Sequence, residues 1–189
     1  MRQLEPDWPK TLEAFHRWHA GRPERWEFID GVPKLMAPGS KAHGLLKNNV
    51  GGALREALRG GPCRALIDSL SVEAGRSWLI PDVVVDCGPL DLSTPNASRP
   101  VIVVEVASPG SQHDDLGRKL KLYLQIQVIH HFLVVSQDER LIVHHERRDE
   151  RTFLSRLIRD GAIALDPPGI TLDLDAIYEG LSFEPAGDP

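Results

Sequence analysis

A short apolar run, Val101 to Val106, most constrains how this chain can fold. Most of its residues are β-branched, only Glu105 interrupts it, and Ser108-Pro109-Gly110 ends it. A run of this length and composition predicts a strand that is buried on both faces. Burying a carboxylate costs free energy unless a partner compensates its charge. The fold must therefore bring a compensating group to Glu105.

The segment that begins near Gln112 supplies a candidate partner. At 100° per residue, one broad apolar arc of the expected helix contains Leu116, Leu120, Leu122, Tyr123 and Ile126. Lys119 falls inside this arc, whereas Arg118 and Lys121 lie on the opposite, solvated side. The sequence therefore predicts an inward acid and an inward amine on consecutive elements.

Composition predicts an ordinary soluble protein of one domain. The 189 residues are 41% hydrophobic and 26% charged. No apolar run is long enough to cross a bilayer, and the first ten residues lack the apolar segment of a signal peptide. Cys63 and Cys87 are far apart and outside any metal-ligand spacing, so we interpret them as free, reduced thiols. We therefore expect a cytoplasmic protein without a membrane partner.

The formal net charge of −5 argues against a general polyanion binder. Between residues 33 and 64, however, basic residues predominate and Glu56 is the only acid. Lys41, Arg55 and Arg59 line one side of an expected helix and are candidate nucleic-acid contacts. On charge alone, a solvated helix face is the simpler interpretation.

The remaining segments predict a mixed α/β fold with one main sheet. Helices are expected at 12–19, after an N-cap at Thr11, at 40–59, after an N-cap at Ser40, and at 175–180. Strands are expected at 26–29 and 34–36 around an Asp30-Gly31 turn, and at 64–67, 71–74, 77–86, 129–135, 141–146 and 152–158. Residues 165–174 are expected to form a connector. Pro33 indicates that its arm of the hairpin is an edge strand.

We expect a single domain over residues 1–189. Its parts are an N-terminal helix, hairpin and helix (1–60), a core (64–136), C-terminal strands with a short helix (137–183) and a loose tail (184–189).

Three residues together indicate a site: Asp82, Glu105 and Lys119. If the strands that carry Asp82 and Glu105 pair, both carboxylates can face one cavity. Two carboxylate oxygens and a backbone carbonyl make half of an octahedral Mg²⁺ shell. A lysine beside such a metal can orient or deprotonate water and stabilise charge on a phosphate. This combination is suited to hydrolysing a phosphodiester.

An ordered set of motifs across nearly the whole chain resembles the Uma-two family of the PD-(D/E)XK nuclease superfamily. The set comprises Trp26-Glu27-Phe28-Ile29-Asp30-Gly31, Met36-Ala37-Pro38, Pro81-Asp82-Val83, Val104-Glu105-Val106, Asp115-Leu116-Gly117-Arg118-Lys119-Leu120 and Leu122-Tyr123. The resemblance implies a restriction-endonuclease-like fold, with a central mixed sheet flanked by helices. It also implies a nuclease activity that uses Mg²⁺ or Mn²⁺.

The resemblance assigns roles to particular residues. Asp82 and Glu105 would hold the metal, together with the carbonyl of Val106, and Glu27 would be the hairpin acid near the site. The superfamily's usual lysine position holds Ala107, so we expect Lys119 on the next helix to replace it. The implied substrate is nucleic acid, with DNA expected, and cutting both strands of a duplex favours a homodimer.

The same residues are also compatible with a protein that has no catalytic role. Glu105 and Lys119 could form a structural ion pair in a noncatalytic protein that binds nucleic acid or another protein. His43 lies on an apolar helix arc, where a core histidine is expected more often than a ligand. The pairs His130-His131 and His144-His145 each offer at most one inward ligand, because neighbouring strand residues face opposite sides.

Overall fold

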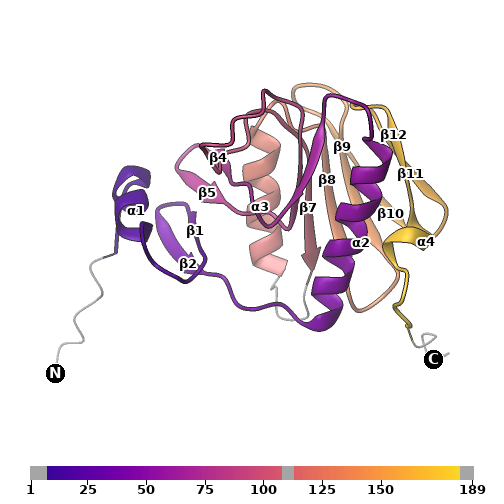
Figure 1. Ribbon diagram of the computed structural model, residues 1–189, viewed down its shortest axis with the longest axis horizontal. Coiled ribbons are helices and arrows are strands. Elements are labelled where there is room, and N and C mark those ends of the chain that lie inside the picture. Colours follow the sequence, from indigo (N-terminus) through magenta and orange to yellow (C-terminus); the bar gives the residue numbers. More distant parts are fainter. Residues whose placement is uncertain (1–7, 108–112, 184–189) are drawn as a thin grey trace.

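The protein is described by a computed structural model at residues 8–107 and 113–183, and its largest sheet has six strands (Figure 1). The strand order is β10-β9-β8-β7-β6-β3. The strands are β3 (Arg64–Ile67), β6 (Val83–Asp86), β7 (Pro100–Ala107), β8 (His131–Ser136), β9 (Ile142–Arg147) and β10 (Phe153–Ile158). Because β7 pairs antiparallel with β6 and parallel with β8, the sheet is mixed. The expected α/β fold around a mixed central sheet is confirmed.

Helices α2 (Lys41–Ala57) and α3 (His113–Gln125) pack on opposite faces of this sheet, with β7 between them (Figure 1). Alternation along β7 explains the arrangement, since Ile102 and Val104 join the core under α2 while Val103 joins the core under α3. Glu105 has the same parity as Val103, which directs its side chain toward α3. The buried strand and the inward face of the helix follow the sequence prediction.

A second, four-stranded sheet stands beside the main one and carries α1 (Leu12–His19) (Figure 1). Its order is β2-β1-β5-β4, with β2 (Val32–Leu35), β1 (Trp26–Ile29), β5 (Ser77–Leu79) and β4 (Val72–Ala74). Phe15 of α1 packs on Phe28 and Trp78 of this sheet. β2, which contains Pro33, is an edge strand as predicted.

The prediction of one strand over residues 77–86 is wrong. The chain leaves the second sheet after Leu79 and enters the main sheet at Val83, so β5 and β6 belong to different sheets. Pro81 has no N–H to donate to a ladder. The N–H of Ile80 binds the side chain of Glu27 instead, at 2.9 Å. This crossing places Asp82 at the junction of the two sheets.

The prediction of an irregular connector at residues 165–174 is also wrong, because this segment contains the second strand of a β-hairpin. β11 (Ala162–Leu165) pairs with β12 (Ile170–Asp173), and α4 (Leu174–Ile177) follows. Ile163, Leu165 and Leu172 alternate with exposed neighbours and extend the core under α2. The Pro-Pro-Gly residues that suggested an irregular connector form only the turn.

The prediction of two free thiols is wrong, because Cys63 and Cys87 form a disulfide. Antiparallel pairing of β3 and β6 sets Arg64 opposite Asp86, so the residues just outside this pair meet with Cα atoms 4.0 Å apart. A separation of 24 residues in sequence hides this proximity. The cytoplasmic location that we inferred from reduced thiols loses that support.

Some expectations lie outside the described residues. These are the Ser108-Pro109-Gly110 strand end, the helix start near Gln112 and the tail at 184–189. Within the described ranges, no helix combines the length and the apolar character needed to cross a bilayer. The single-domain organisation stays a prediction.

The packing of α2 on β3 yields a stability prediction at two neighbouring glycines. A Cβ added at Gly51 would collide with Cδ1 of Ile67, whereas a Cβ at Gly52 would meet no atom within 4 Å. We expect Gly52→Ala to raise the free energy of unfolding by about 0.5–1 kcal/mol through helix propensity. We expect Gly51→Ala to lose this gain and to be destabilised by about 1–3 kcal/mol through overpacking. Urea denaturation measures both, and equal stabilisation would contradict the close packing.

Candidate active site

Asp82 and Glu105 lie side by side because β6 and β7 pair in antiparallel register. Val83 lies opposite Val104, so Asp82 and Glu105, one step further, lie opposite each other at the same end of the two strands. Both are buried, with exposed fractions of 7% and 6%. The structure thus brings together the two carboxylates that the sequence singled out.

Lys119 and Tyr123 of α3 both contact Glu105. The Nζ atom of Lys119 lies 3.1 Å from Glu105 Oε1, and the Tyr123 hydroxyl donates to the same oxygen at 2.7 Å. The two residues are one helical turn apart, so they project from the same face of α3. Burial, followed by the charge of Glu105, raises the pKa of Tyr123 well above its ordinary value. Tyr123 is therefore a fixed hydrogen-bond donor to this carboxylate.

Glu27 reaches the same lysine from the second sheet. Its Oε1 atom lies 2.8 Å from the Nζ of Lys119 and also accepts the N–H of Ile80. Burial alone would lower the pKa of Lys119, but the charges of Glu105 and Glu27 outweigh it and hold that pKa above the ordinary range. Lys119 is thus a buried ammonium group, 6% exposed, held between two carboxylates.

Asp82 is fixed by two other contacts. Its Oδ2 accepts the backbone N–H of Val106 at 2.7 Å, and its Oδ1 lies 3.0 Å from Nε2 of His43. Burial would raise the pKa of Asp82, but the hydrogen bonds from His43 and Val106, with the charge of Lys47, hold it below its ordinary value. Asp82 is therefore ionised at neutral pH.

Glu105 has the opposite tendency. Burial, assisted by the charges of Asp82 and Glu27, raises its pKa to about 7, although Lys119 acts in the other direction. Ionised together, the three carboxylates carry −3 and Lys119 carries +1, which leaves −2 in a buried space. Such an imbalance is costly without a further cation.

This arrangement fits a divalent metal ion. Mg²⁺ and Mn²⁺ prefer hard oxygen ligands, which Asp82 and Glu105 supply, and a +2 charge would balance the site. In an extended strand, the N–H and C=O of one residue point to the same side. The carbonyl of Val106 therefore faces the side of β7 where its N–H meets Asp82. In the described part of the chain no three Asp, Glu, His or Cys side chains form a metal site, so side chains would supply two ligands.

The basic residues predicted to contact nucleic acid lie along α2. Lys41 begins the helix, Arg55 is in its last turn and Arg59 follows it, paired with Glu56. At 1.5 Å per residue, Arg55 lies about 20 Å along the helix from Lys41. Only Lys41 shares the end of α2 that carries His43. Contact of these residues with nucleic acid stays a prediction.

The pairs His130-His131, at the start of β8, and His144-His145, in β9, meet as alternation predicted, with one member of each pair facing the other. His131 Nδ1 lies 2.9 Å from His144 Nε2, and both rings are buried. Burial, followed by the neighbouring His131, lowers the pKa of His144 to about 4. The pair is therefore neutral and structural.

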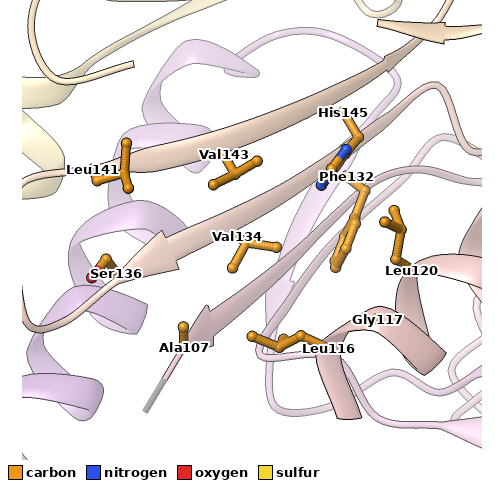
Figure 2. A pocket seen from close by; sticks show the side chains of 10 residues that line it. All are labelled: Ala107, Leu116, Gly117, Leu120, Phe132, Val134, Ser136, Leu141, Val143 and His145. Atoms are coloured by element: carbon orange, nitrogen blue, oxygen red, sulfur yellow. The ribbon is translucent and has the colours of Figure 1, made fainter. Parts of the chain in front are cut away.

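Among the cavities of the described residues, one near the main sheet is lined by Asp82, whereas Glu105, Glu27 and Lys119 are not among its lining residues. A cavity of about 370 Å³ lies between α3 and the strands β8 and β9, with apolar side chains such as Leu116, Phe132 and Val143 directed into it (Figure 2). Its lining contains no acid, lysine or arginine. A second cavity, of about 430 Å³, is lined by Asp82 and His43. The second cavity borders the candidate site at Asp82.

Sequence reasoning missed His43 and Tyr123 as members of this site. The sequence favoured a core histidine at position 43, yet the structure places its ring against Asp82. The available signal was its position one turn into a helix capped by Ser40, where a side chain can reach beyond the helix end. For Tyr123, the signal was the i+4 spacing from Lys119.

The raised pKa of Glu105 predicts how stability depends on pH without metal. A carboxyl whose folded pKa is raised stabilises the fold while it is protonated, and this contribution is lost as the pH rises from about 4.5 to about 7. In EDTA, we expect Glu105→Gln to gain stability relative to the wild type between pH 5 and pH 8, by a few kcal/mol. Chemical denaturation measures this, with the exposed Glu150→Gln as control. Parallel profiles would contradict the assignment.

The sequence is similar to a known protein family and to a protein of another organism. The model of the Uma2 family, described as "Putative restriction endonuclease", matches residues 12–176. The chain is 29% identical over 175 residues to the uncharacterized protein slr1290 of Synechocystis sp., covering 90% of this chain and 92% of that one.

A solved structure shares the fold. It is the crystal structure of a putative nuclease belonging to DUF820 from Anabaena variabilis, with a TM-score of 0.73 at 15% identity, covering 90% of this chain and 98% of that one. The fold is therefore restriction-endonuclease-like, and since the family model spans most of the sequence, this chain belongs to the Uma2 family.

Proposed function

We propose that this protein is a divalent-metal-dependent nuclease that hydrolyses phosphodiester bonds in nucleic acid, with DNA as the expected substrate. The observation that carries the proposal is the buried cluster of Asp82, Glu105, Lys119 and Glu27, whose net charge is −2 when all three carboxylates are ionised, a state that a bound cation would stabilise. Membership of the Uma2 family supports a nuclease in general terms. The metal dependence, the residue roles and the activity of this chain are the proposal.

Asp82 and Glu105 would hold Mg²⁺ or Mn²⁺ together with the carbonyl of Val106. Bound there, the metal would polarise a phosphate oxygen and lower the pKa of a coordinated water. The carboxylates are suited to this because both are fixed before a ligand arrives, Asp82 by the N–H of Val106 and Glu105 by Tyr123. Fixed ligands avoid the cost of ordering them on binding.

Lys119 would act as a positive charge, not as a base. Held as an ammonium between Glu27 and Glu105, it has no free lone pair with which to take a proton from water. It can donate hydrogen bonds to a phosphate oxygen or to the attacking water. Glu27 would then be a positioning residue, because it directs the amine toward the acids.

The proposal includes a homodimer only if the protein cuts both strands of a duplex. The described residues of each chain form one such site, so two cuts call for two copies, which a symmetric pair supplies.

The alternative function is a noncatalytic binding module. The ion pairs of Lys119 favour this alternative, since the ammonium group has two carboxylate partners without any substrate.

Removing either metal ligand tests the proposal. We expect wild-type protein to nick plasmid and cut single-stranded DNA in Mg²⁺ or Mn²⁺ but not in EDTA, and Asp82→Asn and Glu105→Gln to lose about 100-fold or more of this rate. Metal should also raise the melting temperature of the wild type and not of these variants. Glu150→Gln, on an exposed turn, is the matched control. Unchanged melting at millimolar metal, with no cleavage, would favour the noncatalytic module.

Neutralising the lysine separates its charge from its structural role. We expect Lys119→Gln to lose cleavage by about 100-fold while keeping the metal-induced rise in melting temperature, because both metal ligands remain. Without metal the variant should be destabilised by about 3–5 kcal/mol, since two buried carboxylates lose their partner. Differential scanning fluorimetry with and without Mg²⁺ measures both effects. Wild-type cleavage in this variant would exclude Lys119 from catalysis.

A further inference from the structure

The cavity beside Asp82 has the size of a small-molecule site. It measures about 430 Å³, and binding pockets for small ligands enclose roughly 300–1,000 Å³. Five separate parts of the chain line it: the segment that enters β1, the end of β2 with the loop after it, the first turns of α2, the residue that follows β3 and the residue that precedes β6. Asp82 and His43 line the cavity where it meets the proposed metal site.

One wall of this cavity is apolar. It is formed by the loop after β2, with Met36, Ala37 and Pro38. Ala37 and Pro38 are exposed, so their surface is available to a ligand without rearrangement of the core. Apolar surface of this kind can contact the face of a nucleobase by van der Waals packing, which does not depend on which base is present.

The other wall is charged and fixed in place. Arg25 Nη1 lies 3.0 Å from Asp68 Oδ1, its Nη2 donates to the Asp68 carbonyl at 3.3 Å, and Lys47 pairs with the same carboxylate. Arg25 and Lys47 share Asp68, which leaves one positive charge on this wall, and the ionised Asp82, which also lines the cavity, carries the opposite charge. Glu24 also lines the cavity, but it is exposed and solvent screens its charge.

The depth of the acids restricts what can reach them. A phosphate that reacts at Asp82 and Glu105 must approach side chains that are more than nine-tenths buried. The phosphates of a duplex lie on its outside, but the stacked and paired backbone is stiff, whereas a single or locally unpaired strand can bend a nucleotide into a confined pocket. A cavity of this volume admits about one nucleotide and no double helix.

We propose that this cavity binds one unpaired nucleotide, with its base against Met36, Ala37 and Pro38 and its phosphate toward Lys47. The protein therefore selects single-stranded or locally unpaired nucleic acid over intact duplex. This inference rests on the proposed nuclease function for its meaning, but binding can be measured without cleavage. DNA and RNA strands both carry the base and the phosphate that this cavity would bind.

Binding in EDTA tests the inference independently of catalysis. The probes are a fluorescein-labelled DNA strand of about 20 nucleotides, longer than the roughly 4–16-nucleotide footprint of single-strand-binding modules, its blunt duplex, the duplex with a central unpaired bubble, and the RNA strand. By anisotropy, we expect the wild type to bind the strand and the bubble at least about 10-fold more tightly than the blunt duplex. Comparing the affinities for the DNA and RNA strands shows which sugar the protein prefers. Tight binding of either strand supports the assignment of the cavity as a nucleotide site.

Two pairs of variants locate the binding. Ala37→Trp fills the cavity from an exposed loop, and we expect it to weaken strand binding by about 10-fold, whereas Leu92→Trp, at a position 88% exposed, should not. Lys47→Met should weaken binding and reduce its salt dependence by about one phosphate contact, whereas Lys121→Met on the exposed side of α3 should not. Thermal melting confirms that each variant is folded.

The outcomes separate this inference from the proposed function. Equal affinity for strand and duplex, or an Ala37→Trp variant that binds as the wild type does, would overturn the cavity assignment. Expected binding without cleavage in any divalent metal would keep the cavity and reject the nuclease. Cleavage of blunt duplex as fast as single strand, lost in Asp82→Asn, would keep the nuclease and reject the cavity.

Discussion

The ion pairs of Lys119 hold the structure together at the point where its parts meet. The ammonium group comes from α3, Glu105 comes from the centre of the main sheet, and Glu27 comes from the second sheet. All three are buried, so removing Lys119 leaves two carboxylates without their cation in a low-dielectric space. The same contact therefore docks the helix, joins the two sheets and fixes the orientation of the acids. A ligand that binds at this site therefore meets side chains that these ion pairs already hold in place.

Opposing effects act on the ionisation of the two acids at this site. The strand register forces Asp82 and Glu105 together, and burial raises the pKa of Glu105 to about 7 while the hydrogen bonds to Asp82 keep that residue ionised. A protein optimised for stability would replace one acid with a neutral residue. Retaining both leaves excess negative charge beside a cavity. This is the pattern expected where a group is retained for binding or chemistry and its cost is offset elsewhere in the fold.

The sequence predicted those parts of the site that follow from periodicity. Alternation placed Glu105 in a buried strand, and the helical arc turned Lys119 inward, because both patterns are local. His43 was misassigned, because its partner Asp82 lies 39 residues away and joins it only through the meeting of α2 with the sheet junction. Cys63 and Cys87 were misassigned for the same reason, since their contact depends on the pairing of β3 with β6. Contacts that depend on which elements become neighbours are not encoded in local pattern.

Under the proposed function, chemistry and substrate access are divided between two parts of the fold. The acids and the lysine lie on and over the main sheet, where packing on both faces fixes them. The cavity walls come largely from the hairpin region, in Arg25 and the loop from Met36 to Pro38, which lies outside the main sheet. Loops at such positions tolerate changes in length and sequence that buried strands do not. With the proposed nucleotide site, such a fold could alter which nucleic acid it admits while its buried acids stay unchanged, and substrate choice is then expected to vary with the loop after β2.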